Sequence, residues 1–196
     1  NINKNLTLPG NGASDFYSKN WQSAFWTDSA TLKLFTVNSV VKVVIEDIHF
    51  YSSLVSTPTA GCAIQLAGVA GTEDLNKIVM STDINRCSFN GFSDHIFANG
   101  ACQWGISNSI FHGHERYAVY ISCLQWEDAG DSRIIGCDFY GKRANITSLA
   151  HVRQVGSGGL KILGNKFNDK ATKAIDMFFN LPIAHATSVS TITGNS

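Results

Sequence analysis

Ile84-Asn-Arg-Cys-Ser-Phe89 and Ile106-Ser-Asn-Ser-Ile-Phe111 are two copies of the short unit that decides the fold of this 196-residue chain. Three further copies and the start of a sixth follow the same pattern: Ile45-Glu-Asp-Ile-His-Phe50, Ile135-Gly-Cys-Asp-Phe139, Leu163-Gly-Asn-Lys-Phe167 and Ile192-Thr-Gly-Asn-Ser196. The copies that end at Phe139 and Phe167 are one residue shorter. Successive phenylalanines are 39, 22, 28 and 28 residues apart, which excludes helical repeats of nearly fixed period. Such variation is typical of stacked coils whose corners carry loops of different length.

Two further short strands accompany each unit. Apolar alternation predicts one strand after each Phe, with Ile64, Ile96, Val119, Ile146 and Ile175 in a single inward column. Another strand precedes each unit, at 42–45, 81–84, 103–106, 132–135, 160–163 and 190–192. Three short strands per unit predict an all-β fold, a right-handed single-stranded parallel β-helix of about six to seven coils. An antiparallel sandwich would explain the strands but not the repeating unit.

Composition excludes several classes of function. Lys plus Arg and Asp plus Glu both number 15, so the chain lacks the basic face that a nucleic-acid-binding protein needs. Its most apolar runs, 40–45 and 177–184, are too short for membrane insertion. Five cysteines without zinc-type spacing predict buried, reduced thiols, and Cys87 and Cys137 fall in one column of the repeat. Because no phosphate-binding or dinucleotide-binding motif is present, no cofactor is expected.

The repeat units and the segment Gly158-Gly-Leu-Lys-Ile-Leu-Gly-Asn-Lys-Phe167 resemble the pectate-lyase-like β-helices of bacteriophage tailspikes and capsule depolymerases. The resemblance covers residues 36–196 as a β-helix body, and residues 1–35 resemble entry coils. It implies a protein of the phage tail that acts at the bacterial cell surface. The implied partners are a bacterial surface polysaccharide, two further copies in a homotrimer, and other tail proteins bound through termini beyond this piece.

The strand that precedes each unit gives a separate indication of a trimer. Val44, Ile134 and Ile162 are offset from the expected inward column and should therefore face outward, although they are aliphatic. A parallel strand that is apolar on both faces is covered on both, and a neighbouring chain would be a natural cover. The alternative is a register one residue different, since Arg133 and Lys161 would otherwise point inward.

Candidate hydrolytic residues lie in loops beside a predicted groove. Phe97 and Tyr120 are expected to face outward one coil apart, where they would stack on sugar rings or lie under a loop or a second subunit. Glu127 with Asp131, or Glu127 with Glu73, are candidate acid/base pairs for a glycosidase. Trp126 would stack on sugar and raise a carboxyl pKa by desolvation. The alternative is that these acids are only solvated loop residues.

A second cluster, residues 112–117, follows Phe111 at a corner. Arg116 would bind a uronate carboxylate, and His114 or Tyr117 would transfer protons in a polysaccharide lyase. Asp94 and His95 are expected one coil earlier, about 5 Å away. His112 is a further candidate for substrate binding, but His112 and His114 are too few to predict a metal site. The alternative is a polar surface turn.

The sequence therefore predicts a tailspike-type protein that binds a capsule or O-antigen polysaccharide and cleaves it by glycosidic hydrolysis. One alternative is elimination on a uronate-containing glycan through Arg116 and its neighbours. The other alternative is a receptor-binding or structural shaft without catalysis. Fold resemblance does not discriminate among these functions.

Overall fold

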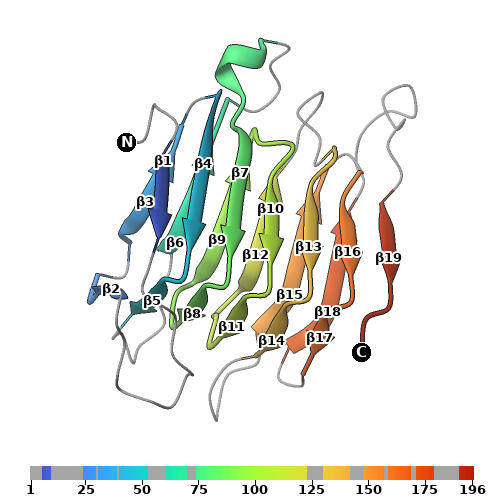
Figure 1. The fold of residues 1–196 in the computed structure, drawn as a ribbon. Helices are drawn as coiled ribbons and strands as arrows, with labels where there is room; N and C mark the ends of the chain where they lie inside the picture. The colour runs from blue at the N-terminus through green and yellow to red at the C-terminus, as the bar shows by residue number, and fades with distance from the viewer. Residues whose placement is uncertain are drawn as a thin grey trace.

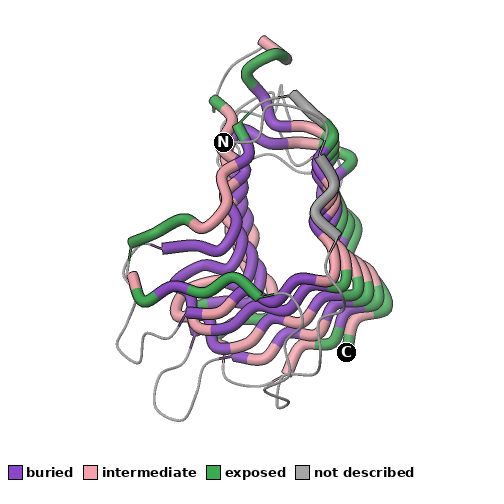
Figure 2. Tube along the Cα trace, turned by 60° about the vertical axis from the view of Figure 1, so that its left-hand side comes forward, coloured by how far each residue is buried: buried purple, intermediate pink, exposed green. Residues whose placement is uncertain are grey.

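The chain is a right-handed parallel β-helix in which each coil contains three strands (Figure 1). A computed structural model describes residues 6–9, 24–29, 31–38, 40–52, 61–69, 74–122, 130–141, 148–156, 159–168, 171–178 and 190–196. Each coil passes in turn through three sheets, which we name B, C and A. Figure 2 shows the coils stacked one behind another, with buried residues along all three walls.

The described strands are distributed over sheets of seven, six and six strands. Sheet B contains β1 (Leu6–Pro9), β4 (Val40–Glu46), β7 (Met80–Asn85), β10 (Gly105–Ser107), β13 (Arg133–Ile135), β16 (Lys161–Leu163) and β19 (Thr191–Thr193). Sheet C contains β2 (Ala24–Thr27), β5 (His49–Ser52), β8 (Ser88–Asn90), β11 (Ile110–His112), β14 (Asp138–Tyr140) and β17 (Lys166–Phe167). Sheet A contains β3 (Lys33–Val37), β6 (Cys62–Ala67), β9 (Asp94–Asn99), β12 (Tyr117–Ser122), β15 (Ser148–Val155) and β18 (Ala171–Phe178). A 3-10 turn, η1 (Leu75–Lys77), precedes β7.

The inward column of sheet B differs from the sequence prediction in two coils. Ile106 pairs with Ile134 and Ile134 pairs with Ile162, and all three are fully buried. The predicted inward residues Ile135 and Leu163 are half-buried on the opposite side. The five units with a described Phe therefore have the same length, five residues from the inward Ile to its Phe, and none is shorter. Because Ile134 and Ile162 face the core, they do not form an apolar outer surface, and the homotrimer stays a prediction that rests on the resemblance.

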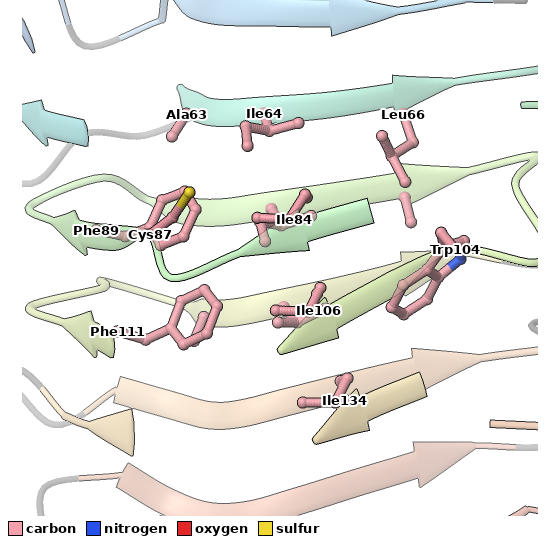
Figure 3. Packing of buried hydrophobic residues seen from close by; sticks show 14 of the residues in the cluster. Ala63, Ile64, Leu66, Ile84, Cys87, Phe89, Trp104, Ile106, Phe111 and Ile134 are labelled. Carbon is pink, nitrogen blue, oxygen red and sulfur yellow. The ribbon is translucent and has the colours of Figure 1, made fainter. Parts of the chain in front are cut away.

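Sheet C carries a continuous stack of phenylalanines. Phe50, Phe89, Phe111, Phe139 and Phe167 occupy equivalent register positions on successive coils. Their ring centroids are 4.8–4.9 Å apart. Figure 3 shows Phe89 and Phe111 on successive coils beside Ile84, Ile106 and Ile134. The repeating unit of the sequence thus supplies one inward Ile from sheet B and one inward Phe from sheet C to the core of each coil.

Sheet A confirms most of the inward column that was predicted for the strands after each Phe. Ile64, Ile96 and Val119 pair in sequence, and the last position of the column is Ile175. Between Val119 and Ile175 lies Val152 rather than the predicted Ile146. The place predicted for Ile146 in this column is wrong, because β15 (Ser148–Val155), which also contains His151 and Arg153, supplies Val152 there. Ile146 lies outside the described residues.

The corner between sheets B and C is closed by hydrogen bonds between neighbouring coils. The backbone N–H of Cys87 donates to Ser109 Oγ (3.1 Å), and that of Cys137 donates to Asn165 Oδ1 (2.9 Å). Asn165 Nδ2 also donates to the carbonyl of Ile134 (3.0 Å). Cys87 and Cys137 therefore occupy one buried column, as predicted, and both are free thiols.

Candidate functional site

The candidate site is the outward face of sheet A, where one register column is half-buried along its whole described length. The column, which we call the outer column, contains Thr36, Gln65, Phe97, Tyr120, Arg153 and Asp176. Its neighbours in each strand point inward, because strand residues alternate between faces. At about 4.8 Å per strand, six positions extend for about 24 Å. Such a row is suited to contact with an extended ligand.

Three aromatic residues of the face form an aromatic platform: Phe97, Tyr117 and Tyr120. The rings of Phe97 and Tyr120 are stacked, with centroids 5.1 Å apart and 17° between their planes. The Tyr117 ring lies 5.2 Å from that of Tyr120, tilted by 38°. All three side chains are half-buried, so the outward orientation predicted for Phe97 and Tyr120 is confirmed.

Arg116 lies beside the platform and forms an ion pair with Asp94. Its Nε donates to Asp94 Oδ1 (3.2 Å), and its Nη2 donates to Asp94 Oδ2. The guanidinium carbon is 5.7 Å and 5.9 Å from the ring centroids of Tyr117 and Tyr120, within cation–π distance. Burial raises the pKa of the Asp94 carboxyl, although Arg116 opposes this shift. The sequence prediction that Asp94 lies next to the 112–117 corner, one coil earlier, is confirmed.

A second charged group continues the outer column on the next two coils. Arg153 Nη1 donates to Asp176 Oδ2, and Lys173 Nζ donates to Asp176 Oδ1 (2.8 Å). The hydrogen bond from Lys173 is the main cause that lowers the pKa of Asp176. Sequence reasoning missed Arg153, because it put Ile146 rather than Val152 in the inward column of this strand. The apolar–polar alternation through Ala150-His-Val-Arg153 was the signal that could have located it.

His114 lies inside the coil and not on the outward face of sheet A. It is fully buried between two other buried imidazoles, His95 at 5.4 Å and His151 at 5.1 Å between ring centroids. His151 Nδ1 and His114 Nε2 are 3.2 Å apart, and burial lowers the pKa of His114 well below its ordinary value. Of the set expected for elimination, only Arg116 and Tyr117 therefore lie on the face.

The remaining sequence candidates do not join this cluster in the described structure. His112 ends β11 in sheet C, where its ring centroid is 6.2 Å from that of Tyr140. Asp131 is exposed in the corner before β13, with a φ of 58°. Glu73, Trp126 and Glu127 lie outside the described residues, so neither predicted carboxylate pair has a described geometry.

Among the described residues, no group of three His, Cys, Asp or Glu side chains is arranged to hold a metal ion. No helix in the same part of the chain is long and apolar enough to cross a membrane. The side chains of the sheet A face offer stacking surfaces, guanidinium and ammonium donors, and two carboxylates.

No family model, curated protein or solved structure matches this chain. Its resemblance to phage tailspikes and depolymerases thus stays a prediction that rests on the repeating unit. The function proposed below depends on the geometry of sheet A, with the resemblance as a second, separate support.

Proposed function

We propose that this protein binds an extended bacterial surface polysaccharide along the outer column of sheet A. The observation that carries the proposal is the stacked pair Phe97 and Tyr120 on the outward face of a parallel sheet. Sugar rings present apolar C–H faces that pack against aromatic rings, while their hydroxyls need hydrogen-bonding partners. Gln65, Arg153 and Asp176 supply such partners in the same column.

The direction of the column also supports a polymeric ligand. Equivalent side chains recur at the interstrand spacing of about 4.8 Å, so a long chain could contact the same face on several successive coils. A small ligand would instead require a concave site lined on several sides. The proposal agrees with the function that the tailspike resemblance implies.

Binding to purified capsular and O-antigen polysaccharides, measured by surface plasmon resonance, tests the proposal. Phe97→Ala and Tyr120→Ala should each weaken binding about tenfold, because each removes a ring on which a sugar would stack. A tenfold change corresponds to about 1.4 kcal/mol of binding free energy. Tyr140→Ala is the matched control, because Tyr140 is a half-buried tyrosine of sheet C. If a polysaccharide binds and both platform variants bind it as tightly as the parent, the proposed surface is wrong.

Hydrolysis is the accompanying proposal, and it depends on loop carboxylates rather than on the platform. A glycosidase needs two carboxyl groups about 5–9.5 Å apart, and Glu127 is the residue shared by both pairs predicted from the sequence. New reducing ends should appear when a bound polysaccharide is incubated with the protein, and Glu127→Gln should abolish them. Unchanged cleavage by that variant would remove Glu127 from the mechanism. Binding without cleavage would instead favour a receptor-binding protein.

A further inference from the structure

In two of the three described ion pairs on the sheet A face, the cation is clearly more exposed than its carboxylate. The Arg116 side chain is 43% exposed, whereas its partner Asp94 is 6% exposed. Lys173 is 56% exposed, whereas its partner Asp176 is 21% exposed. In these two pairs the carboxylate is the more deeply buried member, whereas Arg153 and Asp176 are almost equally exposed. A ligand that approaches this face therefore contacts Arg116 before Asp94, and Lys173 before Asp176.

The register columns of this face hold more cations than carboxylates. In the described strands of sheet A, the outer column and the register column that begins at Lys33 hold the cations Lys33, Arg153 and Lys173. Arg116 adds a fourth cation beside the platform. Asp94 and Asp176 are the carboxylates of the same columns. The two columns together with Arg116 thus hold four cations and two carboxylates, within a chain whose formal net charge is zero.

Arg116 has the geometry of a group that is held for recognition. Its described hydrogen bonds to Asp94 use Nε and Nη2, so the Nη1 edge of the guanidinium retains its two donors. The same guanidinium lies over the rings of Tyr117 and Tyr120. Because the guanidinium is planar and fixed on one edge by a buried carboxylate, little side-chain entropy remains to be lost when a second anion binds.

We infer that the polysaccharide bound at the aromatic platform is acidic, with the carboxylates of uronic-acid units paired to Arg116 and to the cations of the following coils. The inference rests on the proposed function and names the substrate class of that site. Carboxylates suit a guanidinium because two oxygens can accept parallel N–H bonds from it. Pyranose rings of the same units would stack on Phe97 and Tyr120.

The decisive comparison changes the ligand and leaves the protein unaltered. Uronate-containing, phosphate-containing and neutral bacterial polysaccharides are immobilised, and each uronate polymer that binds is also tested after chemical reduction of its carboxyl groups to alcohols. We expect reduction to weaken binding at least tenfold. Binding of the reduced polymer within twofold of the native one, or binding of neutral or phosphate polymers alone, overturns the inference and leaves the proposed function standing. If no polymer of any class binds, both are overturned.

A matched pair of variants assigns the effect to Arg116. Arg116→Lys keeps the charge and removes the planar fork, and we expect it to weaken binding of the acidic polymer about tenfold with little effect on the reduced polymer. Arg86→Lys is the control, since Asp47 accepts from Arg86 Nε and Nη2 in the same manner at the corner after β7. Equal effects of the two variants would contradict the inference. If Arg116→Lys fails to fold, the ligand comparison with the parent protein still decides.

Discussion

The rings of Phe89 and Phe111 lie parallel in the core, with centroids 4.9 Å apart and 1° between their planes. Their strands, β8 and β11, are neighbours in sheet C, so the ring separation equals the interstrand spacing of about 4.8 Å. Aromatic pairs prefer offset or edge-to-face arrangements. The register of the sheet, more than attraction between the rings, therefore sets this geometry, and the stability comes mainly from burial and close packing.

Truncation of Phe111 should be among the most destabilising single changes. Its ring is fully buried between Phe89 and Phe139, so Phe111→Ala removes contacts on both sides and leaves a cavity. We expect a loss of about 3–5 kcal/mol in the free energy of unfolding, measured by urea denaturation. Phe111→Leu should cost less because it fills part of the volume. A loss below 1 kcal/mol for the alanine variant would contradict this account of the core.

Asn165 should stabilise the corner through hydrogen bonds that no apolar residue can replace. Its side chain accepts from the Cys137 N–H and donates to the Ile134 carbonyl and to Asn195 Oδ1. Asn165→Leu would leave the Cys137 N–H buried without a partner, at a cost of about 1–3 kcal/mol, and would remove the side-chain hydrogen bond to the Ile134 carbonyl. Asn168→Leu is a nearby comparison at a half-buried position. Equal urea midpoints for the two variants would argue against a special role of Asn165.

Stability should decrease with acid because of the buried imidazoles. Burial lowers the pKa of His95, His114 and His151 below the ordinary value of 6.5, so the folded chain keeps them neutral while the unfolded chain takes up protons. Stability is then fully present above about pH 6.5 and falls below it, by up to about 1.4 kcal/mol per pH unit for each imidazole. His114→Gln should make the dependence between pH 7 and 5 less steep. An unchanged slope in urea titrations would show that His114 does not contribute.

The ion pair between Asp83 and Arg133 spans two coils because Gly105 lies between them. Arg133 Nη2 donates to Asp83 Oδ1 (3.0 Å), and a Cβ on Gly105 would lie 2.8 Å from that oxygen. Both side chains are well exposed, so a double-mutant cycle should give a coupling of only about 0.2–1 kcal/mol. In a Gly105→Val background the coupling should vanish, since the valine would separate the two groups. A coupling that persisted there would contradict the geometry.

The buried thiols should resist modification while the chain is folded. Burial raises the pKa of Cys87 and of Cys137 to about 12, and the thiolate is the reactive form. We expect a maleimide at pH 8 to label both only after urea is added, with each peptide followed by mass spectrometry. Cys102 is half-buried and should label sooner. Rapid labelling of Cys87 in the folded protein would show that this corner opens.

The repeating unit made the fold predictable, and the errors arose where two apolar residues adjoin. Ile134-Ile135 and Ile162-Leu163 each offer two candidates for one inward position, and alternation alone does not choose between them. The constant spacing of five residues to the next Phe would have chosen Ile134 and Ile162. The position of β15 was missed because pairing with β12 and β18 sets the place of this strand in its coil, and the sequence alone does not give that pairing.

The sequence predicted part of the candidate site, because the repeat fixes which strand residues face outward and which corners stack. Phe97 and Tyr120 follow from alternation, and the approach of Asp94 to Arg116 follows from stacking of equivalent corners. Arg153 was missed along with the strand that carries it. The inward direction of His114 could not be read from the sequence, since a histidine at a corner is compatible with either side of the wall. Only the packing against His95 and His151 determines it.

The equal spacing of the Phe column has a consequence for how outward groups are arranged. Because each coil adds the same rise of about 4.8 Å, the separation of two outward side chains along the axis is determined by the number of coils between them. Transfer of a residue to the equivalent position of the next coil changes that separation by one fixed step and leaves its orientation the same. The fold thus offers a regular series of equivalent outward positions, so the spacing of binding groups can be changed in steps of one coil without any change to the core.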